Sequence, residues 1–244
     1  MPANRVVSHD EWVEARKQHL VREKEFTRLR DQLSRERREL PWERVEKEYT
    51  FQGEHGARTL SELFDGRSQL VIYHAMFSPD TAGPNTPWTV DAACPTCSFW
   101  MDNFNGVTVH LNHRDITMAA VSRAPYPAIA AYEKRMGWGF PWYSSAGSDF
   151  NVDYRVSFAE DALASGQVEY NYRPIPFPVS EAPGISVFLR DGQGAVFHTY
   201  STYARGLDML NVAYHYMDLV PKGRDENGGN AHLWIHRHDE YPAA

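Results

Sequence analysis

The chain has 244 residues, of which 42% are hydrophobic, and its formal net charge is −7. This length and composition suffice for one large domain with a sizeable core, and the negative charge argues against nucleic acid or an anionic membrane as a partner. The N-terminus lacks the apolar core of a signal peptide, and no run reaches the roughly 18 apolar residues of a membrane span. We therefore expect a cytoplasmic protein.

The first 41 residues predict one long helix. Ser8 and Glu11 form a capping-box pattern, strong helix formers follow, and Pro41 ends the segment. Apolar residues make a narrow stripe along this helix, while acidic and basic side chains alternate on its other faces. We assign residues 1–41 to a helical arm, which would lie against the main domain or join two chains in a homodimer.

The rest of the chain alternates strand patterns with helix patterns. Strands are expected at residues 45–51, 70–77, 116–122 and 168–172, at a possible edge in 138–145, and in a hairpin of 185–189 with 195–203. Helices are expected at residues 59–64, 97–104, 126–136, 159–164 and 207–219, whereas 107–113 fits either type. This alternation predicts an α/β sheet with helical crossovers over residues 42–221, followed by a polar tail at 222–244.

Cys94 and Cys97 are the only cysteines in the chain. They follow the apolar strand 70–77 and a long loop, residues 78–93, and they open a helix. Residues three apart lie on one helix face, within reach of a disulfide. In a reducing compartment such a pair is more often catalytic or metal-binding than structural.

A metal site would need two ligands besides the cysteines. The histidines that could supply them are His110, His113, His232, His236 and His238. The sequence contains neither a second cysteine pair nor an HExxH motif. We therefore expect neither a metal ion nor another cofactor.

Segments along nearly the whole chain carry a family resemblance. They include Leu40-Pro41-Trp42, Tyr73-His74, Cys97-Ser98-Phe99-Trp100, Gly147-Ser148-Asp149-Phe150-Asn151 and Phe197-His198-Thr199-Tyr200-Ser201-Thr202-Tyr203. With them the chain resembles the bacterial family known as domain of unknown function 899, described as predicted dithiol–disulfide oxidoreductases. The resemblance implies a thioredoxin-like fold in its peroxiredoxin-like elaboration. This would be a three-layer α/β/α sandwich with the long N-terminal helix added.

The resemblance also implies roles for particular residues. Cys94 would be the exposed nucleophile and Cys97 the resolving thiol, acting on a protein or small-molecule disulfide or thiol. Arg123 is the leading candidate for a cation that favours the Cys94 thiolate. Pro183 precedes a strand, as does the cis-proline that faces the cysteines in thioredoxin-like folds. Together with Trp100 and His74, Arg123 and Pro183 would border the substrate groove.

Two other functions stay open at this stage. A thiol peroxidase could use the same cysteines, although the spacing of Pro87, Thr89 and Cys94 does not fit the peroxiredoxin pattern. Alternatively, the fold could be a non-enzymatic binding module, in which the long loop and aromatic residues hold a small molecule or peptide. Replacing both cysteines with serine separates these classes, because only the binding module would keep its activity.

Overall fold

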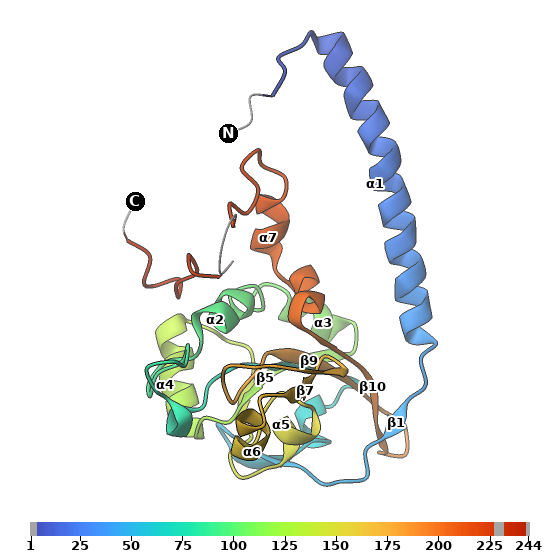
Figure 1. The fold of residues 1–244 in the computed structure, drawn as a ribbon. Helices are drawn as coiled ribbons and strands as arrows, with labels where there is room; N and C mark the ends of the chain where they lie inside the picture. The colour runs from blue at the N-terminus through green and yellow to red at the C-terminus, as the bar shows by residue number, and fades with distance from the viewer. Residues whose placement is uncertain (1–3, 227–231, 243–244) are drawn as a thin grey trace. The chain divides into compact units, whose positions relative to one another are not determined.

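The computed structural model describes residues 4–226 and 232–242. The chain divides into two compact units, Met1–Pro41 and Trp42–Ala244 (Figure 1). In the segment predicted as a polar tail, Ile235 and Arg237 are buried. None of the helices within the described residues combines the length and the apolar character needed to cross a membrane.

The first unit is the helix α1 (His9–Arg38), as the sequence predicted. The Ser8 hydroxyl accepts a hydrogen bond from the Glu11 amide (3.3 Å), and the Glu11 carboxylate accepts one from the Ser8 amide (3.0 Å). This reciprocal pair satisfies two amides that would otherwise lack a partner in the first helical turn. Arginines in the last turn complement the helix dipole there.

An eight-stranded sheet forms the centre of the second unit. In sheet order the strands are β1 (Glu43–Arg44), β10 (Val196–Tyr203), β9 (Gly184–Arg190), β4 (Gln69–His74), β5 (Ile116–Ser122), β6 (Trp142–Ser144), β2 (Thr50–Gly53) and β3 (Gly56–Thr59). Strands β4, β5 and β6 are parallel, β9 is antiparallel to β4, and β10 is antiparallel to β9. A parallel β4–β5 pair, a cysteine-bearing helix after β4 and a hairpin beside β4 make the fold thioredoxin-like.

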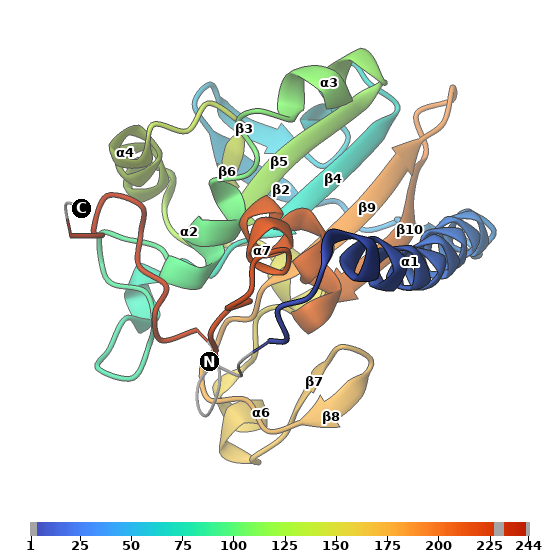
Figure 2. The same ribbon diagram turned by 90° about the horizontal axis from the view of Figure 1, so that it is seen from above.

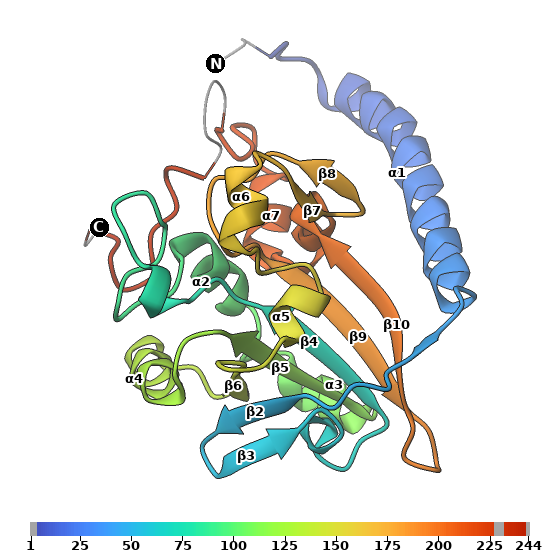
Figure 3. The same cartoon turned by 60° about the horizontal axis from the view of Figure 1, so that its bottom comes forward.

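Helices cover both faces of this sheet. The α-helices are α2 (Pro95–Met101), α3 (Thr108–His113), α4 (Tyr126–Met136), α5 (Phe150–Asp153), α6 (Glu160–Ala164) and α7 (Val212–Met217). The 3-10 helices are η1 (Glu62–Phe64), η2 (Pro79–Thr81) and η3 (Ala204–Leu210). Figure 2 shows α2 and α7 over one face, and Figure 3 shows α5 over the other. A short hairpin of β7 (Val168–Tyr170) and β8 (Arg173–Ile175) lies outside the main sheet.

Side-chain alternation along β4 divides the core in two. Tyr73 belongs to a cluster with Cys94, Cys97 and the aromatic residues of α2 and α4. Ile72 belongs to a second cluster with Phe150 of α5. We call these two sides of the sheet the thiol face and the opposite face.

The structure corrects several predicted elements. The strand predicted at 45–51 begins only at Thr50. It pairs with β3, a strand that the sequence did not predict. The ambiguous run 107–113 contains helix α3. Strand β6 lies between β5 and β2, not at an edge. The helix predicted at 207–219 is interrupted at Asn211, whose side chain caps α7 by accepting a hydrogen bond from the Tyr214 amide.

Candidate functional site

Cys94 and Cys97 lie at the start of α2, beside the end of β4. Cys94 is the N-cap residue, and Pro95 occupies the first helical position, where its fixed φ and missing amide hydrogen cost nothing. The Cys94 amide donates to the Met76 carbonyl (3.0 Å), which ties the helix start to the chain leaving β4. Both residues are free cysteines and are buried, at 1% and 0% exposure, so Cys94 is not exposed as the resemblance implied.

The surroundings of Cys94 favour its thiolate. The hydrogen bond from the Cys97 thiol is the largest influence and lowers the Cys94 pKa, burial opposes it, and the Cys97 and Thr96 amides lower it further. The amide contacts fall short of a regular capping bond, so the thiol–thiol interaction dominates. None of these principal influences is a cation. The start of α2 itself therefore makes Cys94 the more acidic thiol.

Cys97 has the opposite tendency. Burial raises its pKa well above the usual range, and the proximity of Cys94 raises it further. Two donors partly offset this effect, namely the Met76 amide, 3.3 Å from the sulfur, and the Tyr73 hydroxyl. Cys97 is therefore the protonated partner of the pair in the resting state, with donors already in position for its thiolate.

A buried polar network holds the backbone that carries Cys94. The Cys94 carbonyl accepts from the Ser98 hydroxyl (3.0 Å), so the Tyr132 hydroxyl, 2.8 Å from Ser98, must donate to it. The preceding carbonyl, that of Ala93, accepts from Arg237 through Nη2 (2.7 Å) and Nε (3.0 Å). These contacts fix the peptide units on both sides of the Cys94 α-carbon.

Sequence reasoning missed this network. Ser98 follows Cys97 directly, so its place in the helix was the one available signal. Tyr132 comes from α4, and Arg237 comes from a segment that composition alone marks as a polar tail. Arg237 is only 8% exposed and also pairs with Glu240 at 2.9 Å. A short polar segment gives no sequence signal for such a buried contact.

Trp100 is buried on the thiol face, but as a core residue. Its indole N–H donates to the Leu207 carbonyl (2.9 Å), and its ring lies edge-on to Tyr214 at 5.3 Å between centroids. These contacts fix α2 to the elements that follow β10. Trp100 therefore does not supply an open groove wall.

His74 lies on the opposite face. Its Nε2 is 2.9 Å from the Ser186 hydroxyl, and its ring lies 5.5 Å from that of Phe150. Burial lowers the pKa of His74 to about 3, so its imidazole is neutral near pH 7. His74 and the thiols are thus separated by the sheet, and His74 cannot provide a cation for Cys94.

Arg123 and Pro183 lie near each other in the structure, at the end of β5 and the start of β9. Arg123 pairs with the buried carboxyl of Glu181 (3.4 Å) and, more loosely, with Asp80 (4.0 Å). Burial raises the pKa of Glu181 to about 7. No peptide bond among the described residues is cis, so Pro183 follows a trans bond, unlike the cis-proline that the resemblance implied.

Within residues 4–226 and 232–242, no group of three or more His, Cys, Asp or Glu side chains is arranged to hold an ion. The chemistry available at the start of α2 is that of two adjacent thiols with different acidity.

Comparison with known proteins gives a family match over nearly the whole sequence. Residues 1–241 match the model of a family described as bacterial proteins of unknown function, DUF899. No curated protein matches the chain.

Solved structures that resemble the chain include three peroxiredoxins. Peroxidoxin BcpB from Mycobacterium tuberculosis is 13% identical, with a TM-score of 0.42, over 71% of this chain and 94% of that one. Peroxiredoxin Q from Xanthomonas campestris is 14% identical, with a TM-score of 0.39, over 67% and 88%. The mitochondrial 2-Cys peroxiredoxin from Plasmodium falciparum is 11% identical, with a TM-score of 0.40, over 71% and 91%. Nothing about the chemistry of this chain follows from likenesses of that size.

Proposed function

The chain belongs to the bacterial family DUF899, and we propose that this member is a thiol–disulfide oxidoreductase with Cys94 and Cys97 as its redox couple. The observation that carries the proposal is the unequal acidity of the two thiols. The Cys97 thiol donates to the Cys94 sulfur and lowers its pKa, while burial keeps Cys97 protonated. Thiol exchange needs one thiolate to attack first and a second thiol that becomes reactive afterwards.

The reaction proceeds in two displacements. The Cys94 thiolate attacks one sulfur of a substrate disulfide, forms a mixed disulfide, and releases the other sulfur as a thiolate that takes up a proton. Cys97 then loses its proton and attacks the Cys94 sulfur, which forms the Cys94–Cys97 disulfide and releases the second substrate thiol. The substrate gains two electrons and the protein loses two. A dithiol partner would return them.

Access to Cys94 requires a local opening, because both sulfurs are buried. Trp88, Ala92 and Ala93, from the loop that precedes α2, belong to the same core cluster as the cysteines. Loops of this length are commonly functional, and locally opening segments have few regular backbone bonds. We place the substrate groove where residues 78–93 move away from α2.

Trapping of the mixed disulfide tests this proposal. The Cys97→Ser variant is incubated with bis(2-hydroxyethyl) disulfide and analysed by intact-mass and peptide mass spectrometry. We expect a stable adduct of one mercaptoethanol unit on Cys94, whereas the wild type forms an internal disulfide instead. Cys94→Ser is the matched control and should form no adduct. An adduct on Cys97 in that control at the same rate, or no adduct in either variant, would contradict the assignment.

A further inference from the structure

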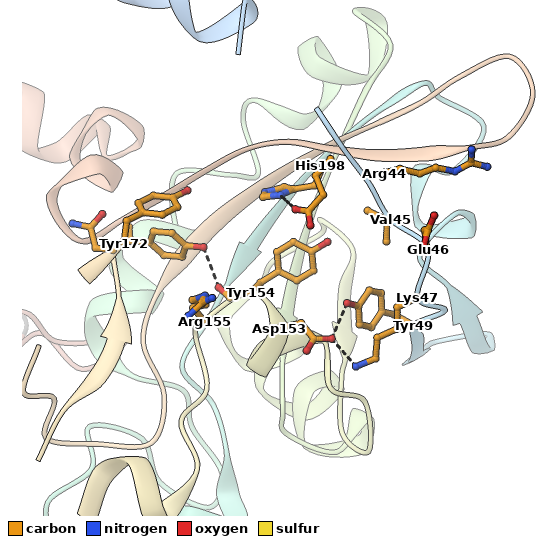
Figure 4. Close-up of a pocket in the computed structure, with 13 residues that line it drawn as sticks. Arg44, Val45, Glu46, Lys47, Tyr49, Asp153, Tyr154, Arg155, Tyr172 and His198 are labelled. Carbon is orange, nitrogen blue, oxygen red and sulfur yellow. Dashed lines mark hydrogen bonds and ion pairs between the residues drawn. The ribbon is translucent and has the colours of Figure 1, made fainter. Parts of the chain in front are cut away.

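A cavity of about 480 Å³ lies on the opposite face, beside β1 and β10 and away from the cysteines (Figure 4). Neither Cys94 nor Cys97 lines it, and all its lining residues belong to the second unit. Aromatic rings are prominent in its wall, namely those of Tyr49, Tyr154, Tyr172, Tyr203 and His198. His198 and Tyr203 come from a segment that carries the family resemblance and has no role in the thiol chemistry.

Backbone strain is concentrated around this cavity. Asn171 and Tyr172 form the two-residue turn between β7 and β8, and both have left-handed conformations, with φ of 54° and 62°. Such turns favour glycine at the second position, which tyrosine occupies here. Arg155, with φ of 57°, also lines the cavity. Three of the seven non-glycine residues with positive φ in the described chain therefore line one cavity, and strain of this kind clusters at functional sites.

Tyr172 is held over the cavity despite this strain. Its hydroxyl donates to the Ser201 carbonyl (3.2 Å), and its ring lies 5.7 Å from that of Tyr203 at an angle of 70°. The side chain is nevertheless 70% exposed, so burial does not account for its conformation. A bound molecule would contact a ring that is already fixed in place, so binding would not have to order this side chain.

A chain of hydrogen bonds sets the polar end of the cavity. His74 Nε2 lies 2.9 Å from the Ser186 hydroxyl, which lies 3.0 Å from the Ser201 hydroxyl, which lies 2.7 Å from His198 Nε2. His74 Nδ1 has no partner among the described residues. A buried acceptor without a partner costs less than a buried donor without one, so we place the His74 proton on Nε2.

The position of that proton determines which group donates and which accepts in each hydrogen bond of the series. His74 donates to Ser186, Ser186 to Ser201, and Ser201 to His198 Nε2, so a neutral His198 carries its own proton on Nδ1. This Nδ1 lies 3.5 Å from the Glu43 carboxylate, whose side chain is 81% exposed. His198 thus holds a solvent-accessible carboxylate at the rim of the cavity.

The cavity is lined by three acidic residues, Glu43, Glu46 and Asp153, and three basic ones, Arg44, Lys47 and Arg155, but two of the basic side chains are already paired with carboxylates. Lys47 is already bonded to Asp149 (2.8 Å) and Asp153 (2.7 Å), and Arg155 is paired with Glu169. In Figure 4 the Arg44 side chain points away from the rings. Within residues 4–226 and 232–242, the Glu43 carboxylate is paired with His198 but with no lysine or arginine.

We propose that this cavity is a second site, which binds a small organic cation such as an alkylammonium or quaternary ammonium compound. The charged head would lie against the rings of Tyr154, Tyr172 and Tyr203 and next to the Glu43 carboxylate. Aromatic faces attract cations of this type through the ring quadrupole, and a neighbouring carboxylate adds a charge interaction. The site does not depend on the redox proposal.

Titration of the full chain with choline, followed by calorimetry and ligand-observed NMR, tests the site. The matched probe is 3,3-dimethylbutan-1-ol, which has the same shape without the charge. We expect saturable choline binding and at least about 10-fold weaker binding of the neutral probe. Glu43→Gln and Tyr172→Ala should each weaken choline binding at least about 5-fold. Tyr216→Ala, which removes an exposed tyrosine on α7, should change nothing.

Tyr172→Gly guards against a folding artefact, because glycine suits the left-handed turn while the ring is lost. Circular dichroism should show this variant folded, and its choline affinity should match that of Tyr172→Ala. The proposal is overturned if the neutral probe binds as tightly as choline. It is equally overturned if neither choline nor butylammonium binds, or if folded Glu43 and Tyr172 variants keep wild-type affinity.

Discussion

Tyr73 and His74 are neighbours in β4, yet they serve opposite faces of one sheet. Tyr73 faces the thiols and donates to Cys97, whereas His74 faces the aromatic cluster of α5 and starts the hydrogen-bond chain to His198. On the thiol face, polar groups stabilise a thiolate. On the opposite face they hold a neutral imidazole and a carboxylate. A single strand can thus support two kinds of chemistry, because alternate side chains never share an environment.

The replacement of Cys94 with serine should have the largest effect. It should abolish the function of the thiol face without changing that of the opposite face. Disulfide exchange should fall at least about 100-fold, because the thiolate is the nucleophile. Choline binding at the cavity should stay unchanged. Thiol release from a model disulfide and calorimetry on the same sample measure both properties. Loss of choline binding in this variant would show that the faces are coupled.

Protonation of His74 should destabilise the opposite face in acid, whereas Glu181, whose pKa burial raises to about 7, contributes stability in the opposite direction over the same pH range. The pKa of His74 is lowered to about 3 in the folded protein, so the unfolded chain binds the proton more tightly and the His74 contribution to stability falls as pH drops from 6.5 towards 3. Between pH 7 and pH 4.5 this group alone costs about 2–3 kcal/mol. Urea unfolding of the wild type and of His74→Asn at both pH values isolates the His74 contribution, because Glu181 is present in both proteins. His74→Asn should be less stable than the wild type at pH 7, but its free energy of unfolding should change between pH 7 and pH 4.5 by about 2–3 kcal/mol in the stabilising direction relative to the wild type. Identical pH dependence in the two proteins would contradict this account.

The thiol face should depend on an arginine from the C-terminal segment. Arg237→Ala removes the charged donor from the Ala93 carbonyl and leaves this buried acceptor without a partner. We expect a loss of about 2 kcal/mol in the free energy of unfolding, measured with urea. Arg205→Ala is the control, because its side chain is 88% exposed, and it should cost less than about 0.5 kcal/mol. Equal losses in the two variants would mean that the Arg237 contact contributes nothing.

The smallest effect should come from Tyr73→Phe. This variant loses one of the two donors to the Cys97 sulfur, which raises the pKa of Cys97 further. The resolving step should slow by about 3- to 10-fold, equivalent to one hydrogen bond of about 1 kcal/mol. Acid-quenched mass spectrometry of the mixed disulfide follows this step directly. First attack by Cys94 should be nearly unchanged, and equal slowing of both steps would point to a general loss of structure instead.

The fold could be predicted from the sequence where local signals agree with the final structure. The Ser8–Glu11 capping box, the apolar strand before the cysteines and the helix closed by Gly137 all appear as expected. Gly137 has a left-handed conformation, which the sequence anticipates because glycine adopts it without strain. Local signals failed where a strand depends on its partner, as in β3. The residues of β3 have no clear strand pattern, and its strand conformation comes from hydrogen bonds to β2.

The candidate site was predictable only in part, for a similar reason. Cys94 and Cys97 are marked by their type and spacing. The face on which a residue lies depends on its register in the strand, so Tyr73-His74 gave no indication that His74 points away from the thiols. Arg237 and Tyr132 reach α2 from distant segments. A buried contact of this kind depends on the tertiary fold, and sequence periodicity does not predict it.

The reduction potential of the Cys94–Cys97 couple tests the central claim most directly. The protein is equilibrated in glutathione or dithiothreitol buffers of defined potential, and its free thiols are counted by mass spectrometry. We predict a two-electron transition between about −120 and −270 mV, the range of known thiol oxidoreductases. If no internal disulfide forms at any potential, Cys94 and Cys97 are not a redox couple and the proposed function is wrong.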